Sequence, residues 1–212
     1  MAKKSVDVSL SGDGGDELFG GYNRHVWLKS IWERTGHLPL IARRLILFAI
    51  TSLSPSSWNQ FFEICMPLLP SRLKMSQPGD KMYKLANVIA AENPEAMYRN
   101  LVSHWNNPES LVLNSKEPKT LLSNSFALPN LSEIEQRVMF LATVTYLSDD
   151  ILTKVDRSAM AVSLETRVPM LDHRVVEFAW RLPLSMKINN GEGKQILRKL
   201  LYKHVPKKLI DK

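Results

Sequence analysis

The sequence predicts an α/β chain that is mostly helical and has one strand near its N-terminus. The strand is expected from Val6 to Leu10, where every second residue is Val or Leu, the period of a half-buried strand. Five of the nine glycines follow within residues 12–21, which indicates a sharp turn into a helix that begins near Asp16. After that, apolar residues recur at helical spacing and prolines separate the runs.

Four helices are expected in the middle of the chain, at residues 38–53, 57–69, 81–92 and 95–105. Prolines near the ends of these ranges favour such boundaries, because proline disrupts a helix interior. Residues 106–130 are rich in Ser, Asn and Pro, and we expect them to form a long connection with at most one short helix.

The strongest helical signal covers residues 132–147. Ser132 and Glu135 match a capping box, and the apolar residues after them recur every three or four positions. A second helix is expected to begin near residues 148–149, with Lys154 away from its apolar face. The last two helices are expected at residues 171–182 and 194–204.

The composition is that of a globular protein and narrows the classes of partner. With 44% hydrophobic and 23% charged residues, the 212-residue chain is not expected to be disordered, collagen-like or a coiled coil. The net charge of +7 favours an anionic partner: a nucleotide, a nucleic acid or an acidic surface. The five tryptophans are interpreted as core residues.

The single cysteine, Cys65, excludes an internal disulfide and a cysteine-based zinc site, which favours a cytoplasmic location. The longest apolar stretch, residues 38–53, is interrupted by Arg43 and Arg44, so no membrane span is expected. The first residues are basic but lack the apolar run of a secretory signal.

Residues 11–22 form a glycine-rich loop with three acidic side chains. Its glycines allow successive backbone N–H groups to point into one concavity, as phosphate-binding loops require. Carboxylates beside phosphate need a cation between them, and Mg²⁺ prefers such oxygen ligands. A P-loop is excluded because Gly21 stands where lysine is required. The loop therefore predicts a nucleotide–metal site; the alternative is a glycine turn whose carboxylates cap the next helix.

Residues 10–22 (LSGDGGDELFGGY) resemble the second nucleotide-site motif of glutamine-hydrolysing asparagine synthetases. Residues 150–157 (DILTKVDR) and 165–172 (ETRVPMLD) are similar to a later signature of that family, and residues 193–198 (GKQILR) resemble a third. The resemblance implies an α/β nucleotide-binding domain of the adenine nucleotide alpha-hydrolase-like kind. Residues 1–212 would then be a mostly helical C-terminal part of the synthetase domain.

The family activates the side-chain carboxylate of aspartate with ATP, forming a β-aspartyl-adenylate and pyrophosphate, after which ammonia displaces AMP. By this resemblance Ser11 and Gly12 contact ATP. Asp13, where many members have Glu, takes part in forming and using the adenylate. Asp16 helps to hold Mg²⁺ and pyrophosphate.

The resemblance also implies that Lys154 and Lys194 face the phosphates and stabilise the negative charge that develops there. Each lysine has a simpler interpretation. Lys154 lies four residues after Asp150 and can form an ordinary helical ion pair with it. Lys194 lies in a basic helix in which one more solvated lysine is unremarkable.

Two elements of the family are not found in these residues. The pyrophosphate loop Ser-Gly-Gly-x-Asp-Ser is absent, and residue 2 is Ala where the glutaminase domain requires its catalytic cysteine. Ammonia is therefore expected from a glutaminase domain or chain that is not present here. Weak or no synthesis is expected from these residues alone, and a homo-oligomer is possible.

Three other functions stay open at this point. The chain could amidate another carboxylate, such as a sugar acid, or act as an inactive binding module. It could also bind nucleic acid, since eight of the last 26 residues are Lys or Arg and two are acidic. No nucleic-acid motif is visible, so no nucleic-acid partner is expected.

Overall fold

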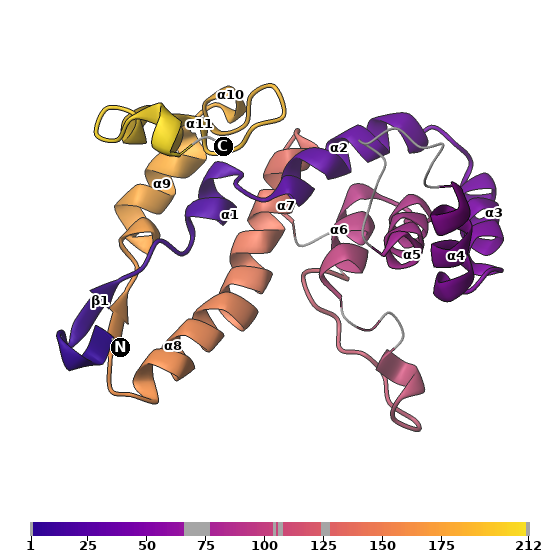
Figure 1. Ribbon diagram of the computed structural model, residues 1–212, viewed down its shortest axis with the longest axis horizontal. Helices are drawn as coiled ribbons and strands as arrows, with labels where there is room; N and C mark the ends of the chain where they lie inside the picture. The colour runs from indigo at the N-terminus through magenta and orange to yellow at the C-terminus, as the bar shows by residue number, and fades with distance from the viewer. Residues whose placement is uncertain (1, 66–76, 104, 106–107, 124–127, 211–212) are drawn as a thin grey trace. The chain divides into compact units, whose positions relative to one another are not determined.

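The computed structural model describes residues 2–65, 77–103, 105, 108–123 and 128–210 (Figure 1). The chain divides into two compact units. The first unit combines both ends of the chain, Met1–Lys29 and Asn124–Lys212, and the second unit is Ser30–Ser123. Among the described residues, no helix has the length and apolar character that crossing a bilayer requires.

The first unit contains a parallel pair of short strands, β1 (Val8–Leu10) and β2 (Glu165–Arg167). Val8 lies opposite Glu165, and Leu10 lies opposite Arg167. The pairing continues past β1, where the Ser11 N–H donates to the Arg167 carbonyl at 2.8 Å. The predicted strand is confirmed in shortened form, but the expectation of one strand was wrong. Three residues of the sequence Glu-Thr-Arg offer no apolar alternation from which β2 could be read.

The glycine loop leads into the short helix α1 (Gly15–Phe19), most of which is buried in the first unit. Gly14 precedes it with φ of 81°, and Gly20 ends it with φ of 69°, a backbone region that favours glycine. Leu18 and Phe19 are buried and pack with Ala179 of α9 (His173–Arg181) and with apolar residues of α11 (Gln195–Leu201). The acidic loop therefore leads into an element that is held from several sides.

One continuous helical rod runs through α7 (Ile134–Leu141), the π-helical segment η6 (Ala142–Leu152) and α8 (Thr153–Met160) (Figure 1). The predicted break near residues 148–149 was therefore wrong. Ser148 does not cap a new helix, because its hydroxyl bonds back to the Val144 carbonyl at 3.1 Å. Other hydroxyls within the rod make the same kind of bond, as Thr145 does to Leu141.

The predicted capping box at the start of this rod was also wrong. Glu133, not Ser132, occupies the N-cap position, and its side chain makes no capping hydrogen bond. Glu135 instead forms an ion pair with Lys29 at 2.9 Å. Because the Glu135 carboxylate pairs with Lys29 of α2 (Asn23–Thr35), it does not accept a hydrogen bond from the backbone at the start of α7 in the described part of the chain.

The end of the first unit follows the sequence prediction more closely. Helices α9 and α11 lie within the predicted ranges and are shorter at both ends. The elements η7 (Pro169–Leu171), α10 (Leu184–Lys187) and η8 (Lys207–Leu209) complete the order. Lys187 is buried over the ring of Trp180, with the amine 4.8 Å from the ring centre, and burial lowers its pKa to about 8.

The second unit is a small helical bundle. Helix α2 (Asn23–Thr35), which was not predicted, leads into it from the first unit. The bundle itself contains α3 (Leu40–Thr51), α4 (Pro55–Cys65), α5 (Pro78–Ile89) and α6 (Pro94–Val102). Helix α5 packs against the other three. The connection after α6 contains the short helix η4 (Pro108–Ser110), as expected.

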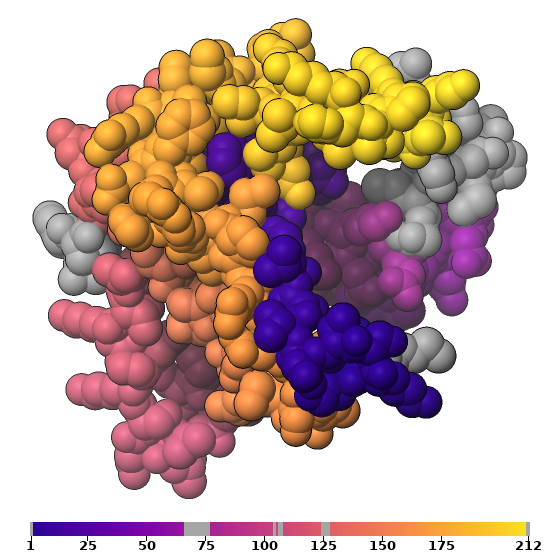
Figure 2. Space-filling view, turned by 90° about the vertical axis from the view of Figure 1, so that its left-hand side faces the viewer, coloured from indigo at the N-terminus to yellow at the C-terminus, as the bar shows by residue number. Residues whose placement is uncertain are grey.

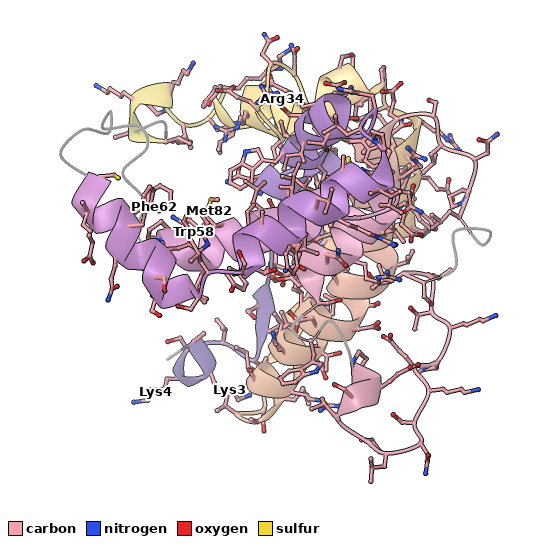
Figure 3. All side chains as sticks on the ribbon, turned by 90° about the vertical axis from the view of Figure 1, so that its right-hand side faces the viewer. Lys3, Lys4, Arg34, Trp58, Phe62 and Met82 are labelled. Atoms are coloured by element: carbon pink, nitrogen blue, oxygen red, sulfur yellow. The ribbon has the colours of Figure 1, made fainter. Side chains whose placement is uncertain are left out.

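Aromatic residues of α4 pack within the bundle without being fully buried. Figure 3 shows Trp58 and Phe62 beside Met82 of α5, and the Trp58 indole N–H donates to the Ile50 carbonyl at 2.8 Å. The interpretation of every tryptophan as a core residue was wrong, because Trp27 is 62% exposed and Trp105 is 57% exposed. The part of the predicted helix beyond Cys65 lies outside the described residues.

Candidate functional site

The open side of the glycine loop is formed by Ser11, Gly12 and Asp13. The Ser11 hydroxyl donates to the Asp13 carboxylate, which fixes the two side chains together. Gly12 is exposed, and a β-carbon built on it would meet nothing within 4 Å. The loop thus exposes its backbone at Gly12, between the partly buried side chains of Ser11 and Asp13. Figure 2 shows this N-terminal segment, in indigo, lying against orange residues from the later part of the first unit.

Asp16 and Lys194 lie together although the sequence separates them widely. The Lys194 amine is 2.8 Å from Asp16 Oδ1, and both side chains are 36% exposed. The Lys194 N–H donates to the Phe19 carbonyl at 2.9 Å, so the backbone of this residue is attached to the end of α1 as well. Lys194 has φ of 58°, the left-handed region that costs a non-glycine residue free energy.

Close backbone packing at glycines makes this contact possible. A β-carbon at Gly193 would lie 3.2 Å from the Gly21 α-carbon and would overlap the Gly20 carbonyl. A β-carbon at Gly21 would overlap both the Asp16 carboxylate and the Lys194 side chain. The two segments therefore meet at a separation that only glycine permits.

Glu17 is buried, unlike the partly exposed Asp13 and Asp16. It is 1% exposed, and the Tyr22 hydroxyl donates to its Oε1 at 2.7 Å. Burial, together with the hydrogen bond to this carboxylate, raises the pKa of Tyr22 well above its ordinary value. Glu17 therefore attaches the loop to Tyr22.

Lys154 lies on the helical rod and is 70% exposed. It forms an ion pair with Asp150, one turn earlier, and the hydrogen bond from this pair raises the pKa of Lys154. This is the helical pair that its spacing predicted. The structure thus joins Asp16 to Lys194, whereas the partner it shows for Lys154 is on the same helix.

A cluster of Tyr22, Arg24 and Tyr146, in which the end of the glycine loop meets the rod, was not predicted. The Arg24 guanidinium lies 3.9 Å from the ring centre of Tyr22 and 4.4 Å from that of Tyr146. The two rings meet edge to face, with 6.0 Å between their centres. Tyr22 ends the recognisable motif, but no spacing rule links it to an aromatic residue in a distant helix.

The sequence profile of the asparagine synthase family matches residues 1–212. The chain belongs to the asparagine synthase family. Among its relatives, the asparagine synthetase [glutamine-hydrolyzing] 1 of Bacillus subtilis is 29% identical over 216 residues, which cover 100% of this chain and 30% of that protein. The asparagine synthetase [glutamine-hydrolyzing] 3 of the same organism is 37% identical over 199 residues, covering 94% of this chain and 24% of the relative.

A putative asparagine synthetase [glutamine-hydrolyzing] of Mycobacterium tuberculosis is 32% identical over 213 residues, covering 97% of this chain and 28% of its own length. The family member described here thus spans less than a third of each of these relatives. No solved structure matches the chain.

The donor set of the loop decides which kind of metal site it can form. Among the described residues, no three His, Cys, Asp or Glu side chains gather closely enough to hold a metal ion. Asp16 is half-exposed and Glu17 is occupied by Tyr22, so one carboxylate remains on the lysine side of the loop. This arrangement fits Mg²⁺ only where phosphate and water supply its other ligands, as is usual for Mg²⁺–nucleotide complexes.

His25 lies directly after the loop, at the start of α2, and its side chain is fully buried. Its ring is 5.4 Å from that of Tyr22, and neither ring nitrogen has a hydrogen-bond partner among the described residues. Burial lowers the pKa of His25 to about 3, because charging the ring there costs its hydration. The folded chain therefore keeps this histidine neutral.

Acid is expected to destabilise the chain through His25. Between pH 6.5 and pH 3 the unfolded chain binds a proton at this residue and the folded chain does not, so the free energy of unfolding falls as the pH drops. The single group accounts for a loss of about 2 kcal/mol between pH 7 and pH 5. Urea unfolding at the two pH values measures it. His25→Gln should remove that part of the loss, and His37→Gln, at an exposed site, should keep it; equal losses in both variants would contradict the assignment.

Proposed function

We propose that the chain takes part in the ATP-dependent amidation of the aspartate side chain, as part of a larger or split enzyme. The products are asparagine, AMP and pyrophosphate. The observation that supports this most is the ion pair between Asp16 and Lys194 beside the glycine loop. This pair supports the proposal because it brings together a carboxylate and an amine from two motifs that are far apart in the sequence. The names of the relatives agree with this reaction.

In the proposed reaction the aspartate β-carboxylate attacks the α-phosphorus of ATP, and the bond to pyrophosphate breaks. Negative charge then grows on the phosphoryl oxygens and the leaving group, and fixed cations stabilise it. Lys194 supplies such a cation, while Ser11 and Gly12 contact the nucleotide from the open side of the loop. Asp13, held by the Ser11 hydroxyl, supports the formation and use of the β-aspartyl-adenylate. Ammonia then attacks the acyl carbon, and AMP leaves with the carboxylate oxygen.

Asp16 would be the protein ligand of Mg²⁺, and Lys154 would add positive charge toward the phosphates. When bound with ATP, the metal would neutralise negative charge on the phosphates. It would thereby lower the free-energy cost of the further negative charge that develops in the transition state. Ammonia would come from a glutaminase domain or a second chain. We expect the enzyme to work in the cytoplasm without nucleic acid or membrane, and a homo-oligomer is compatible with it.

Calorimetric titration with ATP, in the presence of Mg²⁺ and then of a chelator, tests the nucleotide site in the 212-residue chain. Binding is expected to depend on Mg²⁺, and Asp16→Asn should remove that dependence. The matched control Asp80→Asn changes an exposed carboxylate of the second unit and should bind as the wild type does. Absence of binding, or equal effects of the two variants, would exclude the site.

The identity of the acceptor is tested by exchange of labelled pyrophosphate into ATP. Aspartate should stimulate the exchange by the complete enzyme, and a sugar acid should not. The chain alone, supplied with ATP, Mg²⁺, aspartate and ammonia, should release little or no pyrophosphate. Robust turnover by the chain alone would show that these residues suffice, and exchange with the sugar acid instead of aspartate would favour the alternative acceptor.

A further inference from the structure

One face of the helical rod leads from the glycine loop to Lys154. Tyr146, Asp150 and Lys154 follow one another at intervals of four residues, and a π-helical turn takes up more residues than an α-helical one. Residues four apart therefore lie near one line along the rod. Asp150 and Lys154 form an ion pair, and Tyr146 lies four residues before Asp150.

The end of this face that carries Tyr146 contacts Tyr22, the last residue of the glycine-rich loop. The Tyr146 ring meets the Tyr22 ring edge to face, and the Arg24 guanidinium lies over both rings. Tyr22 cannot move freely, because its hydroxyl is bonded to buried Glu17 in α1. A rotation or shift of the rod would separate these rings from the guanidinium. The contact therefore resists the motions that would carry Lys154 to another position.

We propose that Tyr146 is a positioning residue, which acts with Arg24 to fix the rotation of the rod so that Lys154 keeps one position relative to the glycine loop. The part that Lys154 plays toward the nucleotide rests on the proposed function, whereas the positioning itself does not. Asp150 contributes by holding the amine on this face of the rod. Tyr146 itself does not contact the nucleotide.

The position of Lys154 can be followed without any nucleotide. Reductive methylation with ¹³C-formaldehyde gives each lysine an NMR signal, and Lys154→Arg identifies the signal of this residue. Tyr146→Leu should shift that signal. Tyr146→Phe keeps the ring contacts with Tyr22 and Arg24, and should retain most of the chemical shift. Phe140→Leu, on the same rod but against Trp180, is the control and should leave the signal in place.

Nucleotide binding supplies a second measurement that a general loss of packing would not reproduce. Tyr146→Leu should weaken Mg²⁺–ATP binding about tenfold, and Tyr146→Phe should stay within about twofold of the wild type. In the Lys154→Ala background, Tyr146→Leu should weaken nucleotide binding no further, because both changes remove the same contribution of the Lys154 amine to the binding free energy. Additive losses would overturn the proposal, as would an unmoved Lys154 signal in Tyr146→Leu. If the wild type binds no nucleotide, the proposed function fails while the NMR comparison still decides the positioning.

Discussion

Replacing Gly193 with alanine is expected to separate the segment before α11 from the end of α1. The new β-carbon would overlap the Gly20 carbonyl and lie 2.8 Å from its carbon, and neither is the movable end of a side chain. One of the two backbone segments must shift, and such overpacking costs about 2–3 kcal/mol of the free energy of unfolding. The shift also moves Lys194 away from Asp16, so Mg²⁺–ATP binding should be lost together with stability.

Two measurements on the 212-residue chain test the Gly193→Ala variant. Urea unfolding gives the stability, and hydrogen exchange at the Lys194 N–H reports its bond to the Phe19 carbonyl, which should lose protection. Gly15→Ala is the matched control for stability, because a β-carbon there meets nothing within 4 Å and Gly15 begins a helix. Unchanged protection of the Lys194 N–H in Gly193→Ala would contradict the packing described above.

Loss of the Lys194 amine is expected to weaken Mg²⁺–ATP binding by about 2 kcal/mol, or roughly 30-fold, the usual effect of removing a hydrogen bond to a charged group. Lys194→Ala and Lys194→Gly should weaken binding equally, since both remove the amine. They should differ in stability, because Lys194 has φ of 58° and glycine adopts this conformation without strain. The glycine variant should be more stable than the alanine variant by about 1 kcal/mol.

Lys199→Ala provides the comparison for nucleotide affinity, since Lys199 is exposed on the same helix. It should bind Mg²⁺–ATP as the wild type does, even though it lowers the net charge by the same amount. If Lys199→Ala and Lys194→Ala weaken binding equally, general positive charge explains the affinity and the specific contact does not. If the glycine and alanine variants are equally stable, the left-handed backbone of Lys194 carries no strain.

The parts of the fold that sequence reasoning predicted are those with a local cause. The alternation before Leu10 predicts β1, and the glycines after it predict the turn into α1, because each signal depends on neighbouring residues. The strand β2 was missed because its three residues form a strand only beside β1. The continuous rod was missed because Ser148 favours a helix start locally, yet here its hydroxyl bonds back to the preceding turn.

In the candidate site, too, some features were expected from the sequence and others depend on residues that are distant in it. The convergence of Asp16 and Lys194 was expected from a family resemblance, and the glycines that allow it are visible in the sequence. The burial of Glu17 against Tyr22 was not expected, because its position directly after Asp16 in the sequence does not indicate which side its carboxylate faces. What Asp16 and Lys194 do toward Mg²⁺ and the phosphates stays a prediction, as do the roles of Ser11, Gly12, Asp13 and Lys154 toward the nucleotide.

The order in which the chain leaves the ribosome has a consequence for the candidate site. The segment Met1–Lys29 is synthesised before Ser30–Ser123, and its strand partner and Lys194 follow only after that whole unit. The helices of that middle portion have their packing partners close by in sequence, and such local contacts form early. Until its packing partners have been synthesised, the segment Met1–Lys29 exposes apolar residues that include Val8 and Leu10. Chaperones can bind it during that interval. The ion pair between Asp16 and Lys194 can then form only near the end of translation of these residues.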